Sequence, residues 1–177
     1  SYNVTRAAWG HLREQNYGRI LMTSSSAAIG SLGMPAYSMA KAGLIGLGRS
    51  LALEGAPVGI KVNILMPIGY TRSAALNPNE DTRQWMEANF APQMCSPAAT
   101  WLVHEDVACS GEIFTTGAGR VALISTLGVP GWSGGPEISM ESLRDHWSSV
   151  VDRDGSTPML YSRDDLGFYS GPATWRG

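Results

Sequence analysis

Tyr37 and Lys41 are the residues whose types and spacing best suit chemistry, because a phenol and an ammonium lie four positions apart in the run YSMAK. In a helix, that spacing puts both side chains on one face, about 6 Å apart along the axis. An ammonium so close favours the phenolate form, so Tyr37 can serve as a general acid or base. Lys41 and Lys61 are the only lysines among 13 basic residues. The same spacing also occurs by chance on helix surfaces, so the surrounding elements must decide.

The segments around this pair are those needed to position it. The apolar run GRILM leads into Thr23-Ser24-Ser25-Ser26 and predicts a buried strand that ends in hydroxyl residues. A loop with Gly and Pro follows, and then a helix is expected over residues 36–54. A second strand is expected over residues 59–65, ending at Met66-Pro67. Strand, serine, loop and helix in this order form the layout that a catalytic tyrosine requires.

Taken together, these segments resemble the short-chain dehydrogenase/reductase family, whose catalytic centre combines a serine at a strand end with a YxxxK helix. The resemblance is closest to the dehydrogenase domain of peroxisomal-type multifunctional β-oxidation enzymes, through GRILMTSSS, AYSMAKAGLIGLGRSLALEG and WLVHED with SGEIFTTGAGRV. It implies reversible hydride transfer between NAD or NADP, with NAD favoured, and a secondary alcohol or ketone. A 3-hydroxyacyl-CoA or a steroid-like compound is the implied substrate.

The resemblance also assigns roles to residues. Tyr37 would exchange the hydroxyl proton, Lys41 would hold the ribose hydroxyls of the cofactor, and a serine would hydrogen-bond the substrate oxygen. The family's usual spacing before the tyrosine selects Ser24, whereas counting from the Gly-Arg that opens the strand selects Ser25. Because a shift of one residue turns a strand side chain to the opposite face, we favour Ser25 and keep Ser24 in reserve.

The segment after the second strand is implied to contact the nicotinamide. Its members are Pro67, the backbone groups of Ile68, Gly69 and Tyr70, and the hydroxyl of Thr71. The family more often has Pro-Gly at this point, and this chain has Pro-Ile-Gly. Residues 72–94 are then expected to cover the substrate, with Trp, Met and Phe side chains that could equally pack into the core.

Composition excludes several classes of protein. The chain has 177 residues, of which 44% are apolar and 16% charged, as in a globular protein with one core. A net charge of -2 gives no basic field, so nucleic acid is not an expected partner. We find no apolar stretch of about 18 residues, so no membrane partner is expected and a cytoplasmic location is the default. Two cysteines and three scattered histidines predict neither a disulfide framework nor a metal site.

The expected organisation is α/β. Residues 1–125 are predicted to form the C-terminal part of a doubly wound Rossmann-type parallel sheet that lacks the Gly-rich N-terminal half. Residues 126–177 are expected to be a linker, one helix and a C-terminal tail. The chain begins within the family pattern, so we expect part of a larger enzyme, which need not turn over alone. Helices are expected over residues 4–15, 36–54, 81–89, 97–104 and 140–151, strands over 19–23, 59–65 and 112–116, and extended chain over 121–125.

Three glycines interrupt the helix that carries Tyr37. Gly43, Gly46 and Gly48 each cost about 1 kcal/mol relative to alanine, a cost that close packing of another backbone would offset. In the family this helix commonly lies at a subunit interface. We therefore expect a homodimer or homotetramer formed through the helix of residues 37–54.

Two other motifs suggest different functions. Residues 117–122 fit the dinucleotide pattern GxGxxA, but the β-prone residues that follow predict no helix to bind phosphate. Ser133 lies in a GxSxG motif typical of serine hydrolases, which needs a helix directly after the serine, where Pro136 stands instead. A serine hydrolase is thus less favoured than an oxidoreductase. A non-catalytic fragment or assembly subunit that keeps the fold is the other alternative.

Overall fold

The computed structural model of the chain describes residues 1–169. It divides into two compact units, Ser1–Ile124 and Ser125–Gly177. The domain division at residue 125 that the sequence suggested stays a proposal, and residues 170–177 of the expected tail lie outside the described residues. Among residues 1–169, no helix has both the length and the apolar character needed to cross a membrane.

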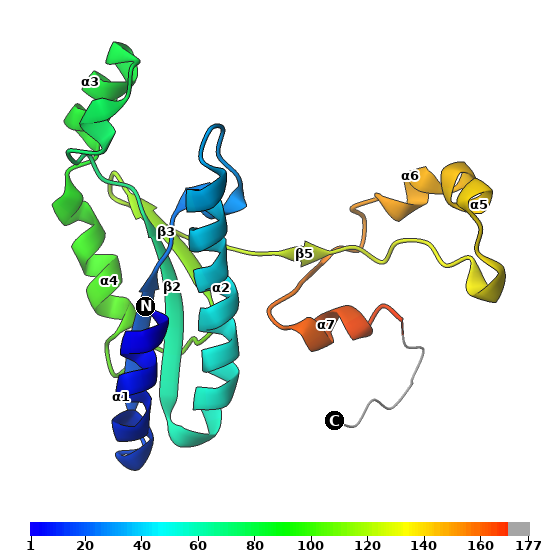
Figure 1. The fold of residues 1–177 in the computed structure, drawn as a ribbon, viewed down its shortest axis with the longest axis horizontal. Helices are drawn as coiled ribbons and strands as arrows, with labels where there is room; N and C mark the ends of the chain where they lie inside the picture. Colours follow the sequence, from blue (N-terminus) through cyan, green and yellow to red (C-terminus); the bar gives the residue numbers. More distant parts are fainter. Residues whose placement is uncertain (170–177) are drawn as a thin grey trace. The chain divides into compact units, whose positions relative to one another are not determined.

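The first unit is built on a four-stranded sheet of order β1-β2-β3-β4 (Figure 1). The strands are β1 (Gly18–Thr23), β2 (Ile60–Pro67), β3 (Ile113–Gly117) and β4 (Arg120–Ile124). β1, β2 and β3 run parallel, so the predicted α/β fold with a parallel sheet is confirmed. β4 pairs antiparallel with β3, which the sequence did not predict.

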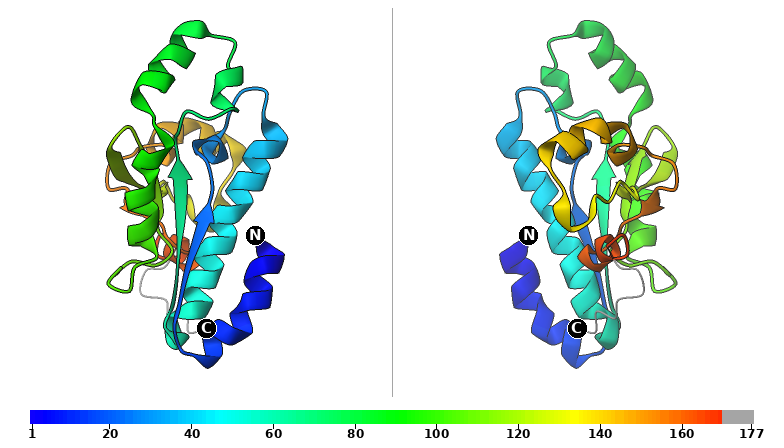
Figure 2. Two further views of the ribbon diagram at one scale, coloured as in Figure 1. Left: turned by 90° about the vertical axis from the view of Figure 1, so that its left-hand side faces the viewer. Right: turned by 90° about the vertical axis from the view of Figure 1, so that its right-hand side faces the viewer.

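Helices cover both faces of this sheet (Figure 2), as the doubly wound arrangement requires. α1 (Tyr2–Glu14) and α2 (Pro35–Gly55) pack on one face, and α4 (Ser96–Leu102) packs on the other. Alternate β2 residues serve the two faces: Ile60, Val62, Ile64 and Met66 join the first core, and Leu65 joins the second. β2 is therefore the buried centre of the unit.

Residues 117–122 form a tight β-hairpin rather than a phosphate-binding turn. Gly117 pairs with Arg120 across the turn, and Ala118 and Gly119 both have positive φ, 49° and 75°. Two successive positive φ values match the right-handed twist of a hairpin. A strand follows this turn, at the point where a dinucleotide-binding motif needs a helix. The structure therefore agrees with the expectation that no phosphate-binding helix follows residues 117–122.

The segment between β2 and β3 holds short helices. η3 (Ala74–Leu76), α3 (Glu80–Asn89) and η4 (Pro92–Cys95) precede α4, and η1 (Ser26–Ile29) and η2 (Ala56–Val58) flank α2. Asn79 caps α3 by accepting a hydrogen bond from the Thr82 backbone N–H at 2.8 Å. Ser96 is the first residue of α4, because the preceding 3-10 turn, η4, runs directly into the helix at Cys95.

The second unit differs from the expected single helix and loose tail. It contains β5 (Leu127–Gly128), η5 (Gly135–Glu137), α5 (Met140–Asp145), α6 (Trp147–Val150), β6 (Thr157–Pro158) and α7 (Ser162–Leu166). Ser139 caps α5 by accepting a hydrogen bond from the Ser142 backbone N–H at 3.1 Å. The expected helix breaks at His146, where the backbone leaves helical geometry and the ring stacks on Trp132 at 4.3 Å. The tail is ordered at α7 because the Asp164 carboxylate accepts hydrogen bonds from two backbone N–H groups.

Candidate active site

Ser24 follows the last residue of β1 and forms hydrogen bonds to both β2 and α2. Its backbone N–H donates to the Leu65 carbonyl at 2.7 Å, which extends the ladder between β1 and β2. Its side chain is only 3% exposed, and the hydroxyl donates to the backbone carbonyl of Lys41 at 2.8 Å. Ser24 therefore fixes α2 to the end of β1, and its proton is already used within the protein.

Ser25 is half-buried and has extended backbone geometry at the start of η1. Its Oγ accepts a hydrogen bond from the Ala27 backbone N–H at 3.2 Å. Within residues 1–169, its O–H has no protein acceptor. A hydroxyl held by its oxygen, with its proton free, can donate to a ligand oxygen.

Tyr37 and Lys41 lie in the first turns of α2, which begins at Pro35 with its fixed φ. Tyr37 is 42% exposed. The Lys41 Nζ lies 5.6 Å from the centroid of the Tyr37 ring and donates to the Thr23 carbonyl at 2.9 Å. The structure thus brings the predicted pair together on one helical face, beside the carboxyl end of β1.

Lys41 has no carboxylate partner in the part of the chain that the structure describes. The two ion pairs found there involve His104 with Asp106 and Arg144 with Asp145. The Thr23 carbonyl fixes the ammonium without neutralising its charge. The positive field of Lys41 is therefore available to a phenolate or to ligand hydroxyls.

Sequence reasoning missed the contribution of Thr23. This residue acts through its backbone carbonyl, a group that every residue carries, so the sequence offers no signal for it. The expectation for Lys41 considered only its side-chain neighbour on the helix. The hydrogen bond that holds Lys41 comes instead from Thr23, the last residue of β1, directly before the serines.

The predicted nicotinamide segment follows β2 and is tied down at two points. The Ile68 N–H donates to the Thr116 carbonyl at 2.8 Å, and the Tyr70 N–H donates to the Phe90 carbonyl at 2.7 Å. Among the described residues, the backbone N–H groups of Gly69 and Thr71 have no protein acceptor. Pro67, the last residue of β2, pairs with Thr116 in the sheet. The segment is thus rigid and keeps two donors for a ligand.

The segment expected to cover a substrate presents two kinds of apolar residue. Phe90 is buried and makes an edge-on ring contact with Trp85 at 4.8 Å. Trp85 and Met94 are exposed. Phe90 therefore belongs to the core, and the other two supply apolar surface.

The three glycines of α2 have different surroundings. A Cβ on Gly48 would lie 2.9 Å from the Ile64 side chain, so this glycine lets α2 approach β2 of the same chain. A Cβ on Gly43 or Gly46 would meet nothing within 4 Å. Packing within the chain accounts for Gly48 and leaves the other two facing open space.

The GxSxG motif does not form a hydrolase elbow. Ser133 is not preceded directly by a strand, since β5 ends at Gly128, and a 3-10 turn rather than an α-helix follows it. His146 stacks on Trp132, and its Nδ1 lies 2.9 Å from the Ser142 carbonyl. No hydrogen bond joins Ser133 to a histidine in residues 1–169.

A protein-family model described as short chain dehydrogenase matches residues 1–84 of this chain. Peroxisomal multifunctional enzyme type 2 of Mus musculus is 37% identical over 156 residues, which are 86% of this chain and 21% of the relative. Residues 1–84 of this chain are therefore similar to the short-chain dehydrogenase family. The resemblance stated from the sequence is thereby confirmed.

Two further relatives agree with this similarity. Acetoacetyl-CoA reductase of Allochromatium vinosum is 43% identical over 84 residues, which are 46% of this chain and 34% of the relative. The structure of full-length peroxisomal multifunctional enzyme type 2 from Drosophila melanogaster is similar with a TM-score of 0.77 and 29% identity, over 93% of this chain and 30% of that one. The chain spans less than two thirds of the length of these relatives.

Proposed function

We propose that this chain carries the proton-transferring part of an NAD(P)-dependent oxidoreductase that interconverts a secondary alcohol and a ketone. The observation that carries the proposal is the placement of the Lys41 ammonium, which lies 5.6 Å from the Tyr37 ring and is held by the Thr23 carbonyl. An unpaired ammonium beside an accessible phenol is what proton exchange at a substrate hydroxyl needs. The match of residues 1–84 to the short chain dehydrogenase model supports the same reaction.

In the oxidation direction, Tyr37 as phenolate accepts the hydroxyl proton of the alcohol. Ser25 donates its hydroxyl proton to the same oxygen and stabilises the charge that develops there. In the reduction direction Tyr37 returns the proton to the oxygen. Ser24 is the alternative to Ser25, but its proton is already donated to the Lys41 carbonyl, which supports Ser25.

The described residues suit a nicotinamide dinucleotide. When bound, the cofactor supplies the hydride acceptor or donor. The free N–H groups of Gly69 and Thr71 are available to its amide, with Pro67, Ile68 and Tyr70 shaping the segment. Lys41 can donate to ribose hydroxyls, since its ammonium has three N–H donors and only one of them donates to the Thr23 carbonyl. We favour NAD over NADP.

For the substrate we propose a 3-hydroxyacyl-CoA, with a steroid-like compound as the alternative. One relative is named acetoacetyl-CoA reductase, an enzyme that acts on an acyl-CoA ketone. The exposed side chains of Trp85 and Met94 provide apolar surface on the segment between β2 and β3, of the kind that an acyl chain or a steroid requires. We propose a cytoplasmic location, although several relatives are named as peroxisomal.

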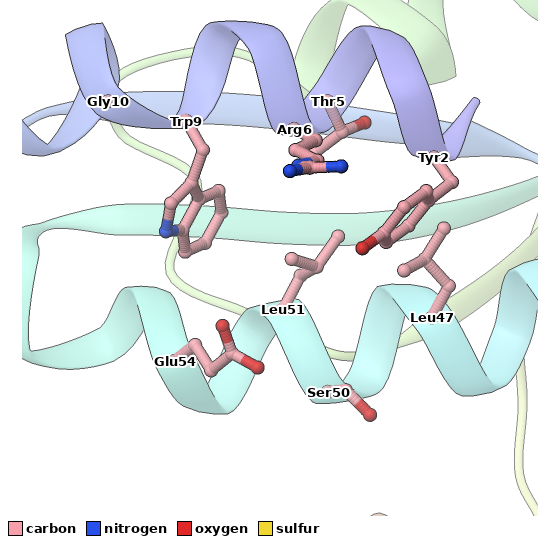
Figure 3. Close-up of a pocket in the computed structure, with 9 residues that line it drawn as sticks. All are labelled: Tyr2, Thr5, Arg6, Trp9, Gly10, Leu47, Ser50, Leu51 and Glu54. Atoms are coloured by element: carbon pink, nitrogen blue, oxygen red, sulfur yellow. The ribbon is translucent and has the colours of Figure 1, made fainter.

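We also propose a homodimer or homotetramer formed through α2. A groove of about 290 Å³ runs between α1 and α2 (Figure 3), where Trp9 and Tyr2 face Leu51 and Leu47. The open space around Gly43 and Gly46 lies on the same helix. Light scattering should give a multiple of the monomer mass for the wild type and a smaller mass for Gly46→Trp. An unchanged mass in Gly46→Trp would contradict assembly through this helix.

The test of the reaction is to follow reduced nicotinamide in the intact protein with a panel of 3-hydroxyacyl-CoA, steroid and simple secondary alcohols. We expect turnover with NAD and with the acyl-CoA substrate. A non-catalytic assembly subunit would give no turnover with any alcohol or ketone and no enhancement of NADH fluorescence. Release of product from an activated ester that Ser133→Ala abolishes would instead favour a serine hydrolase.

A further inference from the structure

The second unit contains a cavity of about 420 Å³. Its wall is formed by the loop between β5 and α5, by Val150 at the end of α6, and by Asp165 of α7 with the two aromatic residues that follow this helix, elements that Figure 1 labels. The loop is the one that carries Ser133 of the GxSxG motif. Among the described residues, the lining lies within residues 129–169, so the cavity uses none of the residues proposed for the reaction.

Three aromatic side chains line this cavity, those of Trp132, Phe168 and Tyr169. The Trp132 ring stacks on the His146 ring with centroids 4.3 Å apart, so one face of the indole is covered and the opposite face is left for other contacts. The Phe168 ring packs on β5, because a Cβ on Gly128 would lie 2.7 Å from it. Two of the three rings are therefore held in place by the protein before any ligand binds, which lowers the cost of ordering them.

Asp165 is the one charged residue in the lining of the cavity, within the part of the chain that the structure describes. The two ion pairs found there involve other residues, His104 with Asp106 and Arg144 with Asp145. No hydrogen bond of the Asp165 carboxylate is found within residues 1–169 either. The negative charge of Asp165 is therefore available to a cation that enters the cavity.

The second unit is also acidic as a whole. Residues 125–169 contain seven acidic and three basic side chains, a net charge of -4, whereas residues 1–124 contain eight acidic and nine basic side chains, a net charge of +1. The summed field of such a unit attracts cations and repels anions. The charge around the cavity thus agrees with the single carboxylate in its lining.

We propose that this cavity binds an organic cation that carries an alkylated ammonium group. The faces of Trp and Tyr rings attract such cations, and a carboxylate neutralises the charge. The alkyl substituents suit the apolar side chains of Ile138 and Val150, which line the same cavity. A metal ion is disfavoured, because no group of three or more His, Cys, Asp or Glu residues that could hold one is found within residues 1–169.

The test is a titration of the intact protein with choline and, separately, with 3,3-dimethyl-1-butanol, an alcohol of the same shape in which carbon replaces the charged nitrogen. Heteronuclear NMR of the Trp132 indole N–H follows binding. We expect a saturable shift and a higher unfolding temperature with choline, and an affinity lower by about tenfold or more for the alcohol. No saturable shift with choline, or equal affinity for the two compounds, would overturn the proposal.

A charge variant connects the binding to Asp165, with calorimetry as the measurement. Asp165→Asn should weaken choline by about tenfold or more, which is about 1.4 kcal/mol, and should leave the affinity for the uncharged alcohol unchanged. Glu141→Gln removes an exposed carboxylate of the same unit that does not line the cavity, and it is the control for general charge effects. Equal choline affinity of Asp165→Asn and Glu141→Gln would refute the assignment.

Ring variants test the aromatic wall in the same way. Trp132→Leu should weaken choline by about fivefold or more, whereas Trp132→Phe keeps an aromatic face and should retain most of the affinity. Trp147→Leu is the matched control, because Trp147 is exposed and does not line the cavity. If Trp132→Leu folds poorly, the comparison of Trp132→Phe with Asp165→Asn still decides. A choline affinity of Trp132→Leu equal to that of Trp147→Leu would exclude the indole from the site.

Discussion

The two halves of helix α2 have opposite surroundings, although one continuous helix contains both. In the carboxyl half, Gly48, Ala52 and Gly55 are buried against β2. In the amino half, Tyr37 and Met39 are exposed. The comparison indicates that the packed half fixes the position of the helix, and that the open half is thereby free to carry side chains selected for chemistry rather than for stability.

The largest expected effect is on turnover, and it distinguishes the role of Ser25 from that of Ser24 at the end of β1. Ser25→Ala removes a hydroxyl whose proton is free for a substrate oxygen, so turnover should fall by about 10²–10³. The unfolding temperature should change little, because the bond that Ser25 accepts from Ala27 is a long one at 3.2 Å. Steady-state kinetics and thermal unfolding of the same preparation measure both quantities. Full activity of Ser25→Ala would remove this residue from the mechanism.

A comparable effect on stability is expected in the packed half of α2. Gly55→Ala puts a Cβ 2.6 Å from the Ile60 carbonyl oxygen, a backbone atom that cannot move away cheaply. We expect the free energy of unfolding to fall by roughly 2–3 kcal/mol, as for other overpacked sites. Urea denaturation measures this free energy of unfolding.

The matched control is the same substitution in the open half. Gly43→Ala meets no atom within 4 Å and should raise the free energy of unfolding by up to about 1 kcal/mol. Equal losses from the two substitutions would mean that the halves do not differ in packing.

A smaller effect is expected for Ser24, which contributes to structure. Ser24→Ala leaves the Lys41 carbonyl without the proton that it accepts at 2.8 Å. The free energy of unfolding should fall by about 1–2 kcal/mol, the usual cost of breaking a buried hydrogen bond. Chemical denaturation detects this change. A stability equal to that of the wild type would show that Ser24 does not fix α2 to β1.

The smallest effect concerns Cys109, which lies near the face of β2 opposite to α2, where the Asn63 side chain donates to its carbonyl. Burial is the main cause that raises the pKa of the Cys109 thiol above its ordinary value. In a Cys95→Ala background, Cys109 should therefore react with a disulfide reagent more slowly than free cysteine does. Because the folded pKa is raised, the unfolded thiol ionises first, and stability should decline slightly as pH rises above about 8.5. A reaction as fast as that of free cysteine would contradict this burial.

The positions of β1, α2 and β2 could be predicted from the sequence because their apolar periodicity and loop residues agree with one another. The structure also brings Tyr37 and Lys41 together, as their spacing predicted, and their catalytic roles stay a prediction. The order of Ser24 and Ser25 in the strand also predicted that their side chains would have different surroundings. These features depend on residues close to one another in the chain.

Features that depend on distant contacts could not be predicted. The break at His146 occurs where its ring meets Trp132, fourteen positions earlier in the chain. The Thr23 carbonyl that holds Lys41 has no sequence signature. The antiparallel pairing of β4 follows from the turn at Ala118, a residue type that seldom takes a positive φ. In each case a tertiary contact or an unusual backbone angle outweighed the local pattern.

The most direct test of the central claim is Tyr37→Phe in the intact protein, with Tyr17→Phe as the control for loss of an exposed phenol. The measurement is the rate of hydride transfer in a single turnover with bound cofactor and substrate. Tyr37→Phe should lower this rate by at least about 10² while cofactor binding and the unfolding temperature stay as in the wild type. Tyr17→Phe should leave the rate unchanged. A single-turnover rate in Tyr37→Phe equal to that of the wild type would contradict the claim that the open half of α2 carries the proton-transferring residue.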